Sequence, residues 1–95
     1  MNLDLNQTIT LSPEVISQEV SGETVLLDLQ SENYFGLDEV GTRIWQLIRE
    51  TSDLQAIYQT LLAEYDVSEE RLQQDLDNLL AEISGLGLIR LEQRA

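Results

Sequence analysis

The sequence predicts an α+β fold of winged-helix type, with a three-stranded antiparallel sheet followed by three α-helices. Two observations predict it: apolar residues alternate with a period of two in the first third of the chain, and near Asp38 their period changes to that of a helix. With 95 residues, 42% of them apolar, the chain is long enough for one small core. We therefore expect a single domain over residues 1–95, with the helices packed on one face of the sheet.

Turn residues divide the first third of the chain into short strands. Ser21-Gly22 supplies one turn and residues 30–33 supply a second, so that the runs between them pair as a meander. A further short strand over residues 7–11 is expected beside the first strand of the meander. The predicted strands are 7–11, 15–20, 24–29 and 33–37.

The strand over residues 24–29 shows the pattern of a half-buried strand. Val25, Leu27 and Leu29 share one face, which we expect to be buried. Thr24 and Asp28 lie on the other face with Leu26, and we expect Asp28 on the solvent side.

Helical periodicity and capping residues define three helices after Asp38. Asp38 is the expected N-cap of the first helix, Ser52 or Asp53 begins the second, and Ser68 begins the third, which Gly85 ends. The predicted helices are 39–50, 53–65 and 68–84, and a short strand is expected near residues 88–91. In the first helix we expect Gly41 to allow a close approach of a neighbouring element and Trp45 to lie in the core with a partner for its N–H.

The composition excludes much catalytic chemistry. The chain contains no cysteine and no histidine, so thiolate nucleophiles, disulfides and the commonest metal ligands and general bases are missing. Asp28, Asp38 and Glu39 are better explained by strand and cap positions than by acid–base or metal chemistry. We therefore predict that the protein is not an enzyme, has no catalytic or metal-binding residues and needs no cofactor.

The charge excludes other ligand classes. With 18 acidic and five basic residues the formal net charge is −13, which opposes contact with phosphate backbones and anionic lipid headgroups. The third helix, where a winged-helix protein would read DNA, carries Arg71 as its only basic residue. No apolar run is long enough to span a membrane, and the start lacks the basic flank of a signal peptide. We therefore expect a cytoplasmic protein that binds neither nucleic acid nor membrane.

The last strand of the meander, residues 33–37, has one side without a partner in the predicted sheet. Soluble proteins usually protect such edges with charge or proline, and Tyr34-Phe35-Gly36-Leu37 contains neither. An extended peptide could add to this edge through main-chain hydrogen bonds. The alternative is that Phe35 and Leu37 are simply core residues and that the edge is short enough to be harmless.

Two segments of the sequence resemble a known family. The run Val25-Leu26-Leu27-Asp28-Leu29 is followed by Tyr34-Phe35-Gly36-Leu37-Asp38-Glu39-Val40-Gly41-Thr42-Arg43-Ile44-Trp45-Gln46-Leu47-Ile48, a combination similar to the signature of the PqqD-like proteins. The resemblance extends in order and spacing from about residue 15 to 91. It implies a non-catalytic recognition element that binds the leader segment of a ribosomally made precursor peptide and presents the rest to a modifying enzyme.

The resemblance also implies where the leader binds. It would be held as an added antiparallel strand on residues 33–37, in the groove between that strand and the third helix. The candidate site residues are Asn33, Tyr34, Phe35, Gly36, Leu37, Arg71, Leu72, Asp75, Leu76 and Leu79. The assignment of the third-helix residues rests on helical spacing, and the three leucines fit core packing equally well.

The implied partners are the leader peptide and an enzyme. Similar proteins serve a radical S-adenosylmethionine enzyme, or the leader peptidase and cyclase of lasso peptides. The alternative from the residues alone is an acidic winged-helix-like adaptor without leader binding, or a homodimer formed through the edge strands.

Overall fold

The computed structural model describes residues 4–93 and contains a three-stranded antiparallel sheet and three α-helices, as predicted. Residues 1–3, part of the segment expected to lack a signal peptide, lie outside the described range. The elements are β1 (Gln7–Leu11), β2 (Val15–Val20), β3 (Glu23–Asp28), β4 (Tyr34–Leu37), α1 (Glu39–Glu50), α2 (Leu54–Glu64), α3 (Glu69–Gly85) and β5 (Ile89–Gln93).

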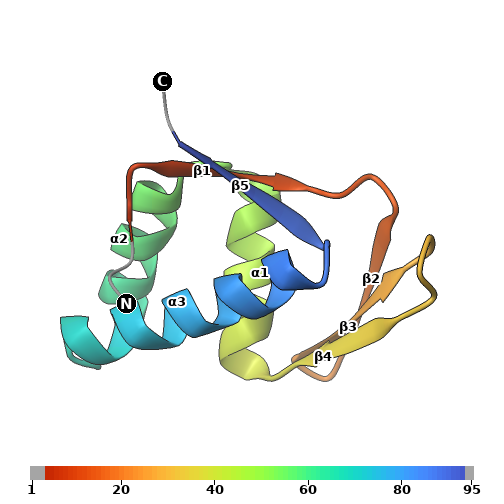
Figure 1. The fold of residues 1–95 in the computed structure, drawn as a ribbon. Helices are drawn as coiled ribbons and strands as arrows, with labels where there is room; N and C mark the ends of the chain where they lie inside the picture. The colour runs from red at the N-terminus through yellow and green to blue at the C-terminus, as the bar shows by residue number, and fades with distance from the viewer. Residues whose placement is uncertain (1–3, 94–95) are drawn as a thin grey trace.

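The strands form two separate sheets, and this corrects the expected position of β1. In the larger sheet the order is β2-β3-β4 with antiparallel neighbours, so that β2 and β4 are its edges. β1 does not join this sheet beside β2. It pairs instead with β5, with Ile9 opposite Leu91, so that the first and last strands of the described chain lie side by side (Figure 1). Sequence proximity favoured β2 as the partner, whereas the burial of Ile9 and Ile89 over the helices favours β5.

The two hairpins of the larger sheet are fixed by residues in the left-handed backbone region. Ser21 and Gly22 have φ of 54° and 81°, as a two-residue turn between right-handed twisted strands requires. The second turn places Glu32 at φ 64° and is closed by a hydrogen bond from the Asp28 N–H to the Asn33 carbonyl, at 2.9 Å. Both turns therefore set the pairing register of the strands that they join.

The prediction of which face of β3 is buried was wrong. Thr24, Leu26 and Asp28 are buried, whereas Val25 and Leu29 are about half exposed. The buried polar groups are satisfied locally. The Asp28 carboxylate accepts hydrogen bonds from the Gln30 N–H at 3.1 Å and the Ser31 hydroxyl at 2.9 Å. These partners offset the cost of desolvating the Asp28 carboxylate, which therefore shares the inward face of β3 with Leu26.

Each helix begins at the cap residue that the sequence indicates. The side chain of Asp38 accepts a hydrogen bond from the Gly41 N–H, that of Asp53 from the Gln55 N–H, and that of Ser68 from the Arg71 N–H. These bonds satisfy N–H groups of the first helical turn that have no partner within the helix.

The core lies between the helices and the two sheets (Figure 1). Its fully buried members include Leu26 of β3, Ile57 and Leu61 of α2, and Leu76 of α3. Trp45 is buried there as expected, but its indole N–H finds no acceptor within residues 4–93. No helix in the described part of the chain is long and apolar enough to cross a membrane.

Candidate functional site

The free edge of β4 presents the backbone groups of Tyr34 and Gly36. In an antiparallel pair, the backbone groups of successive residues point alternately toward the partner strand and away from it. The bond between Asp28 and Asn33 marks a hydrogen-bonded pair, so the same register makes Leu26 and Phe35 the next such pair. The N–H and C=O groups of Tyr34 and Gly36 therefore point away from β3.

A groove of about 550 Å³ runs beside this edge, between β4 and α3, with the start of α1 at one end. Its lining contains both apolar and polar side chains. The residues that line it are Phe35, Gly36, Leu37, Asp38, Val40, Gly41, Ile44, Arg71, Asp75, Asn78, Leu79 and Glu82.

A second hollow of about 280 Å³ lies at the other end of β4, beside the chain that follows α3. It is lined by Asp28, Asn33, Tyr34, Phe35, Leu86 and Leu88. Phe35 lines both hollows, so together they extend along the whole of β4. Sequence reasoning placed Asn33 at this edge but did not include the two leucines that follow α3.

The structure separates the predicted residues of α3 into two groups. Arg71, Asp75 and Leu79 line the groove, whereas Leu72 and Leu76 are 3% and 0% exposed and belong to the core. Helical spacing alone placed these leucines in the groove wall implied by the resemblance, whereas a continuous apolar stripe is the face that a helix ordinarily buries.

Sequence reasoning missed Asn78 and Glu82, which also line the groove. The spacing of polar residues along the third helix indicates that these two residues share a face with Arg71 and Asp75. Counting from Arg71 in helical steps of four, three and four gives residues 75, 78 and 82, which lie on one face of a helix. The polar side chain at each of these positions made the face look like ordinary solvated surface.

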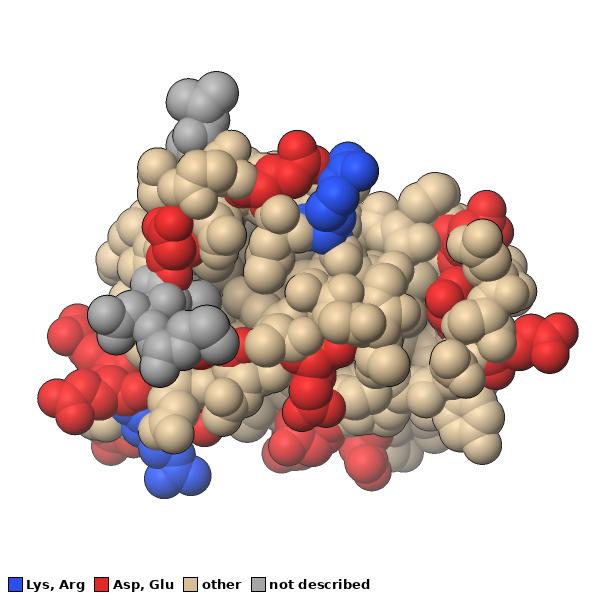
Figure 2. Space-filling model, viewed as in Figure 1, with Lys and Arg blue, Asp and Glu red and all other residues tan. Residues whose placement is uncertain are grey.

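The groove carries an excess of negative charge. Among the described residues, Asp38, Asp75 and Glu82 line it together with one cation, Arg71, whose Nε lies 3.4 Å from the Asp75 Oδ2. Both partners of this ion pair are more than half exposed, so the pair adds little stability and its members are free to contact a ligand. Over the face of the molecule shown in Figure 2, acidic side chains are widespread and basic ones occur in two places.

Close packing at the start of α1 fixes the position of β4. A Cβ on Gly41 would lie 3.2 Å from the Leu37 Cβ, so the absence of a side chain lets the helix sit directly against the strand, as predicted. The Asp38 Oδ1 also accepts a hydrogen bond from the Gly41 N–H, at 2.8 Å, where β4 leads into α1. These contacts hold one wall of the groove at a fixed place relative to α1.

The chemistry that this site offers is recognition through the backbone. It combines outward amide and carbonyl groups on β4 with a mixed apolar and acidic wall on α3. Within residues 4–93 no group of three or more acidic side chains is arranged to hold a metal ion. An extended peptide that hydrogen-bonds to Tyr34 and Gly36 would place alternate side chains in the groove.

Comparisons with known proteins agree with this geometry. TbiB1, solved in complex with the TbiA(beta) leader peptide, is 37% identical and superposes with a TM-score of 0.80 over 85% of this chain and 94% of its own. A lasso peptide synthetase B1 solved with its leader peptide has the same fold at 24% identity, with a TM-score of 0.76 over 87% of this chain and 98% of its own.

No curated protein matches the sequence. The family model for coenzyme PQQ synthesis protein D (PqqD) matches residues 23–89, which include β3, β4 and all three helices. That match spans well over half of the chain, and the chain therefore belongs to the PqqD family.

Proposed function

We propose that this protein binds the leader segment of a ribosomally synthesised precursor peptide as an added antiparallel strand on β4. The observation that carries the proposal is the free β4 edge, with the backbone groups of Tyr34 and Gly36 facing outward beside the groove. Strand addition needs an unpaired edge for affinity and flanking pockets for selectivity, and β4 offers both.

The comparisons support this ligand class. TbiB1 was solved in complex with a leader peptide, and it is similar to this chain over most of both lengths. The groove also suits the proposal better than the other sheet edge does. The free edge of β2 lies on the far side of the sheet from β4, so a peptide added there would not reach the wall formed by α3.

The charge of the groove indicates the chemistry of the leader. A peptide lying against Asp75 and Glu82 would gain from basic side chains at positions that face α3, with apolar side chains directed toward Leu79. Because these charges are near the surface, the affinity should fall as salt is added.

A protein that binds the leader in this way would present the rest of the precursor peptide to another protein. By holding the leader, it would raise the local concentration of the following segment near a separate modifying enzyme, and it would itself perform no catalysis. The enzyme would be either a radical S-adenosylmethionine enzyme or the leader peptidase and cyclase of a lasso peptide. We place this work in the cytoplasm, where ribosomal precursors are made.

Calorimetric titration tests the proposal. The ligand is the synthetic leader of a precursor peptide from the same genome, and the control is a scrambled peptide of the same composition. We expect saturable one-to-one binding of the leader and no binding of the control. Equal heats for the two peptides, or no binding to folded protein, would contradict leader recognition.

A further inference from the structure

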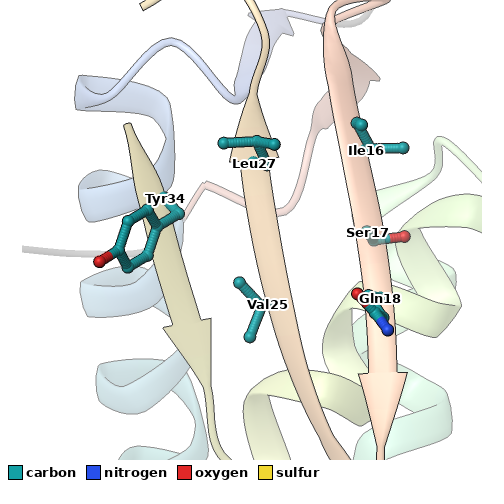
Figure 3. A pocket seen from close by; sticks show the side chains of 6 residues that line it. All are labelled: Ile16, Ser17, Gln18, Val25, Leu27 and Tyr34. Carbon is teal, nitrogen blue, oxygen red and sulfur yellow. The ribbon is translucent and has the colours of Figure 1, made fainter. Parts of the chain in front are cut away.

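The outer face of the larger sheet points away from the helices, and no helix or strand of residues 4–93 covers it (Figure 1). It carries a set of exposed apolar side chains beside the polar Gln18 (Figure 3). Its members are side chains of β2, β3 and β4 and of the residue after β3. They are Ile16 (51% exposed), Val20 (60%), Val25 (48%), Leu29 (53%), Tyr34 (77%) and the half-buried Leu27. We call this set the outer sheet patch.

The strand register makes the outer sheet patch continuous. Ile16 lies opposite Leu27, and Leu27 lies opposite Tyr34, so three side chains form one row across three strands. Figure 3 shows this row, with Val25 beside it on β3. A hollow of about 550 Å³ lies over these residues. Isolated exposed apolar residues are ordinary, whereas a contiguous patch is typical of an interaction surface.

The charges around the outer sheet patch indicate which kind of protein would bind to it. Residues 1–42, which include all of the larger sheet, contain eight acidic residues and no basic one. Glu14, Glu23 and Glu32 lie at the ends of the strands that carry the patch. A second copy of this chain would bring like charges together around the apolar contact. A partner with an apolar surface bordered by lysine and arginine would instead be attracted.

The patch also lies where a bound leader would end. A peptide added antiparallel to β4 runs from the Leu37 end toward the Tyr34 end, so its carboxyl end would leave the groove beside Tyr34. The segment to be modified follows the leader, and it would emerge beside the row formed by Ile16, Leu27 and Tyr34. An enzyme seated on the outer sheet patch would therefore meet its substrate directly.

We infer that the outer sheet patch is the docking surface for the enzyme that acts on the segment following the leader, and that this enzyme presents an apolar surface bordered by basic residues. This inference rests on the proposed function, because leader binding defines where the substrate emerges. The patch and the groove share only β4, so docking and leader binding are separable by substitution.

The test uses the double variant Ile16→Thr, Val25→Thr. Threonine is β-branched and has a good strand propensity, so these substitutions remove apolar surface from exposed positions while keeping the strands. Val67→Thr is the matched control, because Val67 is 45% exposed and lies in the turn before α3. Each protein is titrated separately with the synthetic leader and with a purified radical S-adenosylmethionine enzyme or lasso-type leader peptidase from the same genome.

We expect the double variant to bind the leader with unchanged affinity and the enzyme at least about tenfold more weakly, with Val67→Thr resembling the wild type in both titrations. Equal enzyme affinity for all three proteins would overturn the docking surface and leave leader binding intact. Failure of the wild type to bind the leader would instead contradict the proposed function. Sedimentation showing a dimer that the double variant abolishes would also overturn the inference, by assigning the patch to a second copy.

Discussion

The Thr24 hydroxyl donates a hydrogen bond to the Thr42 hydroxyl at 2.9 Å, and the two residues are 2% and 3% exposed. This bond joins β3 to α1 inside the core. It fixes the helix relative to the sheet whose outer edge, β4, forms one wall of the groove. A buried polar pair of this kind is stabilising only while both partners are present.

Replacing one partner of this pair should therefore cost more than replacing both. We expect Thr24→Val to lower the free energy of unfolding by about 1–3 kcal/mol, because it leaves the Thr42 hydroxyl buried without its partner. The double variant with Thr42→Val should recover part of that loss. Urea denaturation measures both, with Thr10→Val at an exposed position of β1 as the control. If the loss of unfolding free energy in the double variant equalled the sum of the two single losses, the two hydroxyls would not be coupled.

Gly41→Ala should destabilise the protein although alanine is the better helix former. Alanine gains up to about 1 kcal/mol in helix propensity, but its Cβ would lie 3.2 Å from the Leu37 Cβ, which cannot move without moving β4. We expect a net loss of about 1 kcal/mol in thermal or urea unfolding. Gly85→Ala in α3 is the control, because nothing lies within 4 Å of its added Cβ, and it should not destabilise. A gain in stability for Gly41→Ala would contradict the close approach.

Gly36→Pro should weaken leader binding by about tenfold, because it removes an N–H that faces the free edge of β4. The change leaves the β3–β4 ladder intact, since Phe35 and Leu37 supply that ladder. Gly36→Ala keeps the N–H and adds a Cβ into open space, so it should bind as the wild type does. Calorimetry with the synthetic leader compares the three proteins. If Gly36→Pro is folded and binds normally, the peptide does not pair at this residue.

The Arg43–Glu64 pair should give a pH-dependent contribution to stability. The Arg43 guanidinium donates two hydrogen bonds to the Glu64 carboxylate, at 2.6 and 2.8 Å, and lowers the pKa of that carboxyl below its ordinary value of 4.5. A lowered pKa in the folded state means that the stabilisation is present above pH 4.5 and is lost as the pH falls through the lowered value.

The test is the difference in melting temperature between the wild type and Glu64→Gln. We expect the wild type to be more stable at neutral pH and the difference to shrink as the solution is acidified below pH 4.5. The two proteins differ only at residue 64, so the difference reports on Glu64. A difference that stays constant into acid would mean that the ion pair does not supply it.

The sequence predicted the elements well because local signals determine them. Asp38 and Ser68 cap their helices as expected, and Ser21-Gly22 makes its turn, because cap and turn chemistry depends on a few adjacent residues. The partner of β1 and the inward face of β3 depended on contacts distant in sequence. The Thr24–Thr42 bond joins residues 18 positions apart, and no local pattern reveals it.

The site was predictable to a similar degree. The free edge at β4 follows from strand order, and Asp75 and Leu79 line the groove. Their contact with a leader peptide stays a prediction. Polarity alone could not distinguish a groove-lining residue such as Asn78 from solvated surface. The apolar character of Leu76 pointed equally to a ligand and to the core that it occupies.

The most direct test of the account is backbone amide hydrogen exchange, measured residue by residue by NMR with and without the synthetic leader. In the free protein we expect rapid exchange at Tyr34 and Gly36, whose N–H groups face the free edge, and slow exchange at Phe35, which is paired with β3. Bound leader should slow exchange at Tyr34 and Gly36. Unchanged exchange at both residues with saturating leader, or new protection at Ser17 and Glu19 on the opposite edge, would contradict strand addition to β4.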